Sequence, residues 1–348
     1  MNHIITKLPM DYVRAVDMGL QGSLTEVSYG VKNYINSSRK LVTNQKIDSK
    51  EVGRETVEGE EIFKKCNVYL PSGYDKEDIN SRYNVLYLLH GVGGDRNEWL
   101  SGNGMTDNNY IICNIVDNLI ASGEIEPLII VFPEGRSAYN WTDRSFNTQG
   151  TNILGFYYFD YELRYDLIPF IESEYKTYAN SNVKTPEAID CNRKHRAIAG
   201  LSMGGMQSLN LTLGGYRCDS TTVTETVSPW DNGLDTTVST PGMLDLFAYV
   251  GAFSNAPTTS DGKKLGAGIL SSDYKLSLLY LTCGDADEIA YQVGYEKAID
   301  QLSETAGDKL MEYNTEIIEG GIHDFDVWNK GAYQFVRLAF ENEKYRRK

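Results

Sequence analysis

A Gly-x-Ser-x-Gly pentapeptide at residues 200–204 constrains the fold of this chain more than any other feature. It follows the short apolar segment 196–199, which is typical of a buried strand, and it precedes an apolar run that is typical of a helix. A strand, a tight turn with a serine at its tip and a helix form a nucleophile elbow. Glycines are needed there because side chains beside so sharp a turn would collide. The pattern predicts that Ser202 projects from the top of a sheet, beside a helix N-terminus that favours negative charge.

A base for this serine has to be sought among only four histidines, because a serine hydroxyl is a poor nucleophile until its proton is taken. His3 lies in the terminus, and His90 ends an apolar strand and opens a glycine turn. His195 precedes the strand that leads into the elbow, so it belongs at the opposite end of the sheet from Ser202. His323 follows a later strand, where a loop at the top of the sheet is expected. Elimination and position therefore favour His323 as the base over a purely structural role.

The acid that orients the histidine should lie between Ser202 and His323, because nucleophile-elbow enzymes order their triad as serine, acid, histidine. The best strand of that interval covers 276–283, and the next five residues, 284–288, include three acids, Asp285, Asp287 and Glu288. Asp287 is the preferred candidate and Asp285 the second. Each also suits a turn or a helix N-cap, which is the structural alternative.

An oxyanion hole is the fourth requirement, since charge develops on the carbonyl oxygen during acyl transfer. One donor should be the backbone N–H of Met203, the residue after the nucleophile. The other should come from the glycine-rich turn at 90–94, where the N–H of Val92 is preferred and those of Gly91 and Gly93 are alternatives. The structural alternative is a plain glycine turn.

Further residues are candidates for substrate contact. Gly91 lets a ligand approach the backbone closely. Tyr139 and Trp141 belong to a polar aromatic loop that follows a strand, and they form either a platform for a phenolic acid or sugar, or a loop that covers its own aromatics. Trp328 either lines the pocket or packs beneath the histidine loop.

Several motifs agree in order and rough spacing with one known family, from about residue 21 to the end. They are 21–29, 66–71, the His90 turn with Trp99 after it, 196–205, 283–287 and 320–328. On these motifs the chain resembles the feruloyl and acetylxylan esterases of carbohydrate esterase family 1, within the α/β-hydrolase superfamily and similar to esterase D. The resemblance implies a triad of Ser202, Asp287 and His323, which agrees with the reading of the residues.

The resemblance also implies a substrate: a feruloyl ester on arabinoxylan, a plant cell-wall polysaccharide, with an acetyl ester on xylan second. A hydrolase of S-formylglutathione-type thioesters shares the fold and is another enzyme alternative. A non-catalytic carbohydrate-binding protein is the alternative from a different class, and an intact serine, histidine and acid argue against it.

Alternating strands and helices predict a single α/β-hydrolase domain over 21–348, with a mostly parallel central sheet flanked by helices and two early antiparallel strands. Residues 1–20 are expected to form an arm or linker. Two stretches depart from the family pattern: a polar insertion at about 33–60 and an insertion or lid candidate at about 214–245. Helices are expected at 111–121, 161–175, 288–305 and 330–343.

Acidic residues outnumber basic ones, 48 Asp and Glu against 33 Lys and Arg, for a formal net charge of −15. This balance disfavours nucleic acid and anionic membranes as partners, because phosphate contacts need clustered Lys and Arg. It does not disfavour an ester on a neutral polysaccharide. The five cysteines form no Cys-x-x-Cys pair, so no metal or redox site is expected, and a serine esterase needs no cofactor.

No stretch of the sequence is long and apolar enough to span a membrane. The first residues lack the apolar core of a signal peptide. The resemblance favours a secreted protein whose export signal is absent from this chain, and a cytoplasmic location is the alternative. Nothing in the sequence predicts an oligomeric state.

Overall fold

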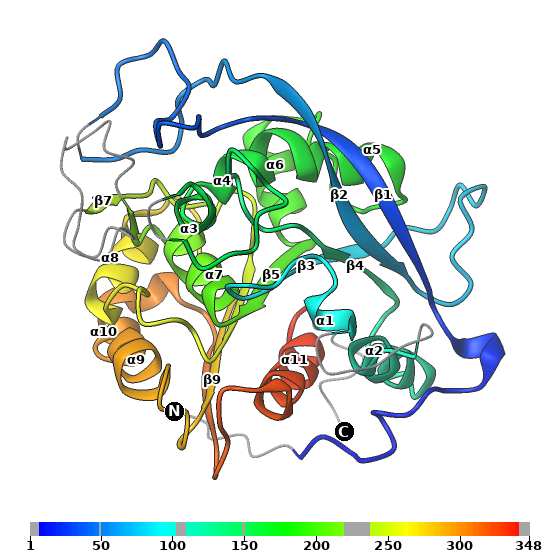
Figure 1. Cartoon of the computed structure of the whole chain (residues 1–348). Helices are drawn as coiled ribbons and strands as arrows, with labels where there is room; N and C mark the ends of the chain where they lie inside the picture. The colour runs from blue at the N-terminus through cyan, green and yellow to red at the C-terminus, as the bar shows by residue number, and fades with distance from the viewer. Residues whose placement is uncertain (1–6, 49, 102–108, 148–149, 219–236, 341–348) are drawn as a thin grey trace.

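The computed structural model describes residues 7–48, 50–101, 109–147, 150–218 and 237–340. Within these ranges one large sheet has the strand order β1-β2-β4-β3-β5-β8-β9-β10 (Figure 1). Its strands are β1 (Ser23–Lys32), β2 (Glu61–Leu70), β3 (Asn84–Leu89), β4 (Leu128–Phe132), β5 (Arg196–Leu201), β8 (Tyr249–Phe253), β9 (Leu278–Gly284) and β10 (Tyr313–Ile318). β6 (Tyr216–Cys218) and β7 (Thr237–Ser239) form a separate antiparallel pair.

Six neighbouring strands of the large sheet are parallel to one another: β4, β3, β5, β8, β9 and β10. The first two strands are antiparallel, since β2 pairs in antiparallel fashion with both β1 and β4. β1 and β2 form a long curved ribbon at one side of the molecule (Figure 1). The predicted fold class, a mostly parallel sheet with two early antiparallel strands, is confirmed.

Helices cover both faces of the sheet. They are α1 (Glu98–Ser101), α2 (Ile111–Ala121), α3 (Asn152–Phe156), α4 (Phe159–Glu162), α5 (Ile168–Glu174), α6 (Pro186–Arg193), α7 (Met203–Leu213), α8 (Gly262–Ser271), α9 (Lys297–Ile299), α10 (Leu302–Ala306) and α11 (Phe325–Leu338). Side chains of β3 alternate between two cores: Val85 and Leu89 pack on the side of α7, and Leu86 and Leu88 on the side of α2 and α11. Burial on both faces explains why the parallel strands are continuous apolar runs in the sequence.

Two of the four expected helices are interrupted and one begins earlier. The expected helix at 161–175 contains a π-helical turn at Leu163–Leu167, between α4 and α5. The one at 288–305 is divided into a π-helical turn at Tyr291–Glu296, α9 and α10, and Gln301 between α9 and α10 has a positive φ of 57°. α11 begins at Phe325 because Asp324 caps it by accepting from two backbone N–H groups; residues 341–343 of that prediction lie outside the described residues.

The segments that depart from the family pattern are joined to the core where the structure describes them. Ile35, Val52 and Val57 of the polar insertion are buried in the α7-side core. In the N-terminal arm, the hydroxyl of Tyr12 donates to Glu124 and its ring lies edge-on to Tyr333, 6.0 Å between centroids. β6 and β7 both belong to the insertion or lid candidate at 214–245. Residues 219–236, between these two strands, lie outside the described residues, as do residues 1–6 of the arm.

Candidate active site

Ser202 occupies the turn between β5 and α7 in a backbone conformation that few side chains adopt, with φ of 50° and ψ of −115°. Hydrogen bonds hold this turn: Ser202 N donates to the Phe253 carbonyl at 2.9 Å, and Ala256 N donates to the Ser202 carbonyl at 3.0 Å. Gly200 and Gly204 leave room for it, since a Cβ on Gly200 would lie 2.5 Å from the carbonyl carbon of Gly204. A strained residue that its surroundings hold in place is common at functional sites.

Three side chains from distant parts of the sequence form a chain of hydrogen bonds at this turn. His323 lies in the loop after β10, and its Nε2 is 3.0 Å from Ser202 Oγ. Asp287 lies in the loop after β9, and its Oδ2 is 2.8 Å from His323 Nδ1. They meet because β5, β9 and β10 are parallel, so that the loops after these strands all lie at the C-terminal end of the sheet. A hydroxyl, an imidazole and a carboxylate in this order can activate a serine oxygen.

The carboxyl of Asp287 is buried but amply supplied with donors. Its Oδ1 accepts the backbone N–H groups of Ile289 at 3.0 Å and Ala290 at 2.9 Å, while Oδ2 faces His323. Burial by itself raises the pKa of this carboxyl, but the hydrogen bond and charge of His323 and the Ala290 N–H outweigh it, so the pKa of Asp287 is lower than its usual value. Asp287 is therefore ionised at neutral pH and can stabilise a protonated imidazole.

Asp285, the second candidate acid, has a different partner. It is exposed, and its Oδ1 accepts the backbone N–H of Gly320 at 2.6 Å. The contact ties the loop after β9 to the start of the loop that carries His323. Of the two competing acids, the structure brings Asp287 to the imidazole.

The glycine turn after β3 lies against the serine, since a Cβ on Gly91 would approach the Cβ of Ser202 to 3.1 Å. Gly91 N donates to Glu98 Oε2 at 2.7 Å, and Gly94 N donates to the Gly91 carbonyl at 3.2 Å. The N–H of Gly91 is thus engaged, which leaves Val92 and Gly93 as candidate oxyanion donors in this turn. Met203 begins α7, and the first N–H of a helix has no acceptor within the helix.

Glu98 is the residue of this site that the sequence analysis missed. Its carboxylate lies inside the glycine turn, so close that a Cβ on Gly94 would come within 2.2 Å of Oε2. Burial raises the pKa of Glu98, and the bond from Gly91 opposes that rise. In the sequence Glu98 is distinguished only by its place directly before Trp99, and this place does not predict the contact with Gly91. The indole N–H of Trp99 donates to the Leu89 carbonyl at 2.9 Å and fixes the same loop.

The predicted substrate-contact residues lie in different environments. Trp328 is only 7% exposed and its ring lies edge-on to His323, with centroids 5.2 Å apart, so it packs against the histidine, in line with the second of its two predicted roles. Tyr139 is 51% exposed, and Trp141 is half-buried. A stacking role for these two stays a prediction.

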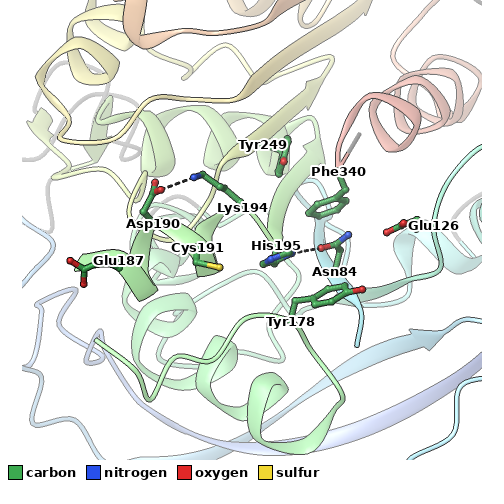
Figure 2. A pocket seen from close by; sticks show the side chains of 10 residues that line it. All are labelled: Asn84, Glu126, Tyr178, Glu187, Asp190, Cys191, Lys194, His195, Tyr249 and Phe340. Atoms are coloured by element: carbon green, nitrogen blue, oxygen red, sulfur yellow. Dashed lines mark hydrogen bonds and ion pairs between the residues drawn. The ribbon is translucent and has the colours of Figure 1, made fainter. Parts of the chain in front are cut away.

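The side chains of the two other described histidines have partners other than Ser202. His90 is buried, and its ring nitrogens lie 2.7 Å from the Gly91 carbonyl and 2.5 Å from that of Glu134, so the ring links the glycine turn to the end of β4. His195 lies just before β5, at the other end of that strand from Ser202, in a pocket with Tyr178 (Figure 2).

The described residues contain no group of three or more His, Cys, Asp or Glu side chains placed to hold a metal ion. Over the same part of the chain, every helix is too short or too polar to cross a membrane.

Comparison with known proteins places the chain among esterases. Residues 63–231 match the family model described as "Putative esterase". The chain is 36% identical over 279 residues, 79% of its length, to an endo-1,4-beta-xylanase/feruloyl esterase of Xylanibacter ruminicola, and 40% identical over 153 residues, 44% of its length, to endo-1,4-beta-xylanase Y of Acetivibrio thermocellus. These alignments cover 29% and 12% of the two relatives, so the chain spans less than a third of either.

Solved structures share the fold over nearly the whole chain. A feruloyl esterase module from Clostridium thermocellum, complexed with sinapinate, superposes with a TM-score of 0.59 at 24% identity and covers 97% of this chain and 93% of its own. A ferulic acid esterase of carbohydrate esterase family 1 from Anaeromyces mucronatus, in complex with ferulic acid, gives 0.62 at 20% identity and covers 96% of each chain. The resemblance predicted from the sequence is thus confirmed: the chain shares the fold of feruloyl esterases over nearly its whole length, and most of its sequence is similar to that of an endo-1,4-beta-xylanase/feruloyl esterase.

Proposed function

We propose that this chain is a serine carboxylic-ester hydrolase, and that Ser202, His323 and Asp287 are its catalytic triad. The observation that carries the proposal is the continuous chain of hydrogen bonds from Ser202 Oγ through His323 to Asp287 Oδ2. Ser202 Oγ attacks the ester carbonyl carbon while His323 Nε2 takes its proton. His323 then returns the proton to the departing alcohol oxygen, and the acyl group stays on the serine.

The acyl-enzyme is released by water in the reverse sense. His323 Nε2 takes a proton from water, the hydroxide oxygen attacks the acyl carbon, and the proton returns to Ser202 Oγ. In both halves the backbone N–H groups of Met203 and Val92 stabilise the negative charge on the carbonyl oxygen. Asp287 holds the imidazole with Nδ1 protonated, so that Nε2 is free to accept.

We propose a feruloyl ester on arabinoxylan as the substrate. Two similar proteins support this choice, since one is an endo-1,4-beta-xylanase/feruloyl esterase, and the other, a ferulic acid esterase that shares the fold, was solved in complex with ferulic acid. The acidic chain fits a neutral polysaccharide better than a polyanion. A polymer of the plant cell wall also favours an enzyme that acts outside the cell. We further propose that 21–348 form one catalytic domain.

Hydrolysis of methyl ferulate, an aryl acetate and S-formylglutathione by the wild type and by Ser202→Ala tests the proposal. We expect release of ferulate by the wild type and a fall of at least about 10³-fold in Ser202→Ala, because the triad acts as a unit. Turnover of the acetate alone would move the substrate to acetyl esters, and turnover of the thioester alone to a thioesterase. No turnover of any of the three by folded wild-type protein would contradict an esterase.

A further inference from the structure

A pocket of about 640 Å³ opens at the end of the sheet opposite to Ser202 (Figure 2). It lies where β3, β5 and β8 begin, and α6 and Phe340, two residues after the end of α11, form further parts of its wall. Its volume is within the range of small-molecule sites. The lining residues are Asn84, Glu126, Tyr178, Glu187, Asp190, Cys191, Lys194, His195, Tyr249 and Phe340. We propose that this pocket is a second ligand site, which binds a neutral sugar chain.

Aromatic rings line the pocket from separate elements. Tyr178 is 48% exposed, and its ring is stacked on that of His195, with centroids 4.7 Å apart and planes 26° from parallel. Tyr249 and Phe340 form a second pair, 4.9 Å apart and tilted by 59°. The C–H face of a pyranose is apolar and carries slight positive charge, so it packs on the negative face of an aromatic ring. Because the stack with His195 fixes the Tyr178 ring, little side-chain entropy is lost when a ligand binds there.

The polar atoms beside these rings suit hydroxyl groups. His195 Nδ1 lies 2.8 Å from Asn84 Oδ1. With the amide oxygen assigned to this contact, Nδ1 carries the proton, Nε2 is an acceptor and the Asn84 Nδ2 a donor. Burial lowers the pKa of His195, and the positive charges of Arg196 and Lys194 lower it further, so the ring is neutral at neutral pH. A neighbouring acceptor and donor match a sugar hydroxyl, which donates and accepts at once.

The charges of the lining argue against an anion. The lining carries the carboxylates of Glu126, Glu187 and Asp190 and the ammonium of Lys194. Asp190 pairs with Lys194 at 2.6 Å and with Arg193 at 3.6 Å, so both of these cations already face a carboxylate. Free ferulate or phosphate would be repelled, whereas carboxylate oxygens accept hydrogen bonds from hydroxyls readily. A neutral polyol is therefore favoured over an acid.

The two sites lie at opposite ends of one strand, because His195 precedes β5 and Ser202 follows it. β5 has six residues and so spans about 20 Å. A short oligosaccharide cannot reach both sites along the surface, but a long polymer can be held at one while another part of it reacts at the other. Such tethering raises the effective concentration of the polymer's esters without touching the chemistry. The proposal that the sugar is xylan rests on the proposed function, whereas the proposal that the pocket binds a sugar does not.

The exposed thiol of Cys191 gives a local probe of this pocket, and Cys66, Cys113 and Cys283 are buried. The rate at which iodoacetamide alkylates Cys191 is measured by mass spectrometry of its peptide, with and without ester-free xylohexaose. We expect the sugar to slow this alkylation in the wild type and in Ser202→Ala alike. Free ferulate should not slow the alkylation of Cys191. Spermidine is included as a cation, because protection of Cys191 by spermidine would indicate a cation site.

Tyr178→Ala should weaken the protection by xylohexaose about two- to tenfold, the loss expected for one stacked aromatic contact. Tyr178→Phe should keep it. Tyr165→Ala is the matched control, since Tyr165 is a tyrosine of similar exposure, 46%, that lines a different pocket. On feruloylated arabinoxylan Tyr178→Ala should raise KM, with kcat and the hydrolysis of methyl ferulate unchanged.

Three results would overturn the second site: no protection by xylohexaose, protection that Tyr178→Ala leaves unchanged, or protection by spermidine but not by the sugar. Because xylohexaose carries no ester, these measurements of Cys191 alkylation do not depend on esterase activity. An inactive wild type that still shows the Tyr178-dependent protection would refute the proposed function and keep the sugar site.

Discussion

Replacement of Asp287 by asparagine should stop catalysis by turning the imidazole into the wrong tautomer. The argument rests on the two backbone N–H groups, of Ile289 and Ala290, that point at Asp287 Oδ1. In Asp287→Asn they require an oxygen at that position, so the amide oxygen faces them and the NH₂ group faces His323. An NH₂ donor at Nδ1 forces the proton onto Nε2, and Nε2 can then no longer accept the proton of Ser202.

The size of the loss of activity follows from the free-energy cost of the other orientation of the introduced amide. Turning the amide so that its oxygen faces His323 restores the productive tautomer but leaves both backbone N–H groups without an acceptor. Each buried unsatisfied group costs about 1–3 kcal/mol, which gives about 2–6 kcal/mol for the pair. At 1.36 kcal/mol per tenfold change in rate, we expect kcat to fall by about 30-fold to 3 × 10⁴-fold.

The assay is kcat on methyl ferulate, together with the thermal midpoint of the folded variant. Asp285→Asn is the matched control, since it is the same change two residues away in an acid whose partner is Gly320 N rather than His323. We expect it to keep most of the activity. The reasoning fails if Asp287→Asn stays within threefold of wild type, or if Asp285→Asn is the variant that loses activity.

Three further predictions concern Gly204 of the elbow, Glu98, and Asp166 in the π-helical turn at Leu163–Leu167. Gly204→Ala should lower stability by about 1–3 kcal/mol, because its Cβ would lie 2.6 Å from a backbone carbonyl oxygen that cannot move aside, whereas Gly19→Ala, with nothing within 4 Å, should leave the thermal midpoint unchanged. Glu98→Ala should lower kcat/KM on methyl ferulate about tenfold, because it leaves the Gly91 N–H without its acceptor. Glu98→Gln keeps an acceptor oxygen and should therefore keep most of the wild-type rate. An equal loss of kcat/KM in both variants would contradict this role of Glu98. Burial raises the pKa of Asp166 from its usual 3.8 to about 6. Between these two pH values the native state holds a proton that the unfolded chain has released, so the free energy of unfolding falls as pH rises. Asp166→Asn should make the thermal midpoint depend less on pH between pH 4 and 6, and an unchanged pH dependence would contradict this prediction.

Much of the sheet could be predicted because its strands are buried on both faces. β3 and β4 appear in the sequence as uninterrupted apolar runs with the bounds that the structure has, and the strand before Ser202 is marked by the glycines of the turn. Helices were harder to predict where tertiary contacts override local pattern. A Cβ on Gly294 would lie 2.0 Å from the Asn255 carbonyl oxygen, so the chain at Tyr291–Glu296 approaches that backbone closely and adopts a π-helical turn in place of a regular helix.

Glu98 could not be predicted because its partner is a backbone N–H. No residue type in the sequence marks the Gly91 N–H as a group that needs an acceptor, and an acid at the start of a helix is common for another reason, its favourable interaction with the helix N-terminus. Only the fold shows that the carboxylate is turned back into the preceding loop. Its effect is to remove one of the three N–H groups that the sequence left open for the oxyanion.

The choice between Asp285 and Asp287 was open for a similar reason, since both follow the same strand at positions that suit a turn. In the structure both acids act on the loop that carries the histidine. Asp285 accepts the N–H of Gly320 at the start of that loop, and Asp287 accepts from the imidazole of His323 further along it. The loop is thus held at two points by carboxylates two residues apart. Loss of Asp285 should therefore loosen the position of His323, whereas loss of Asp287 changes where its proton resides, and only the second change removes the base.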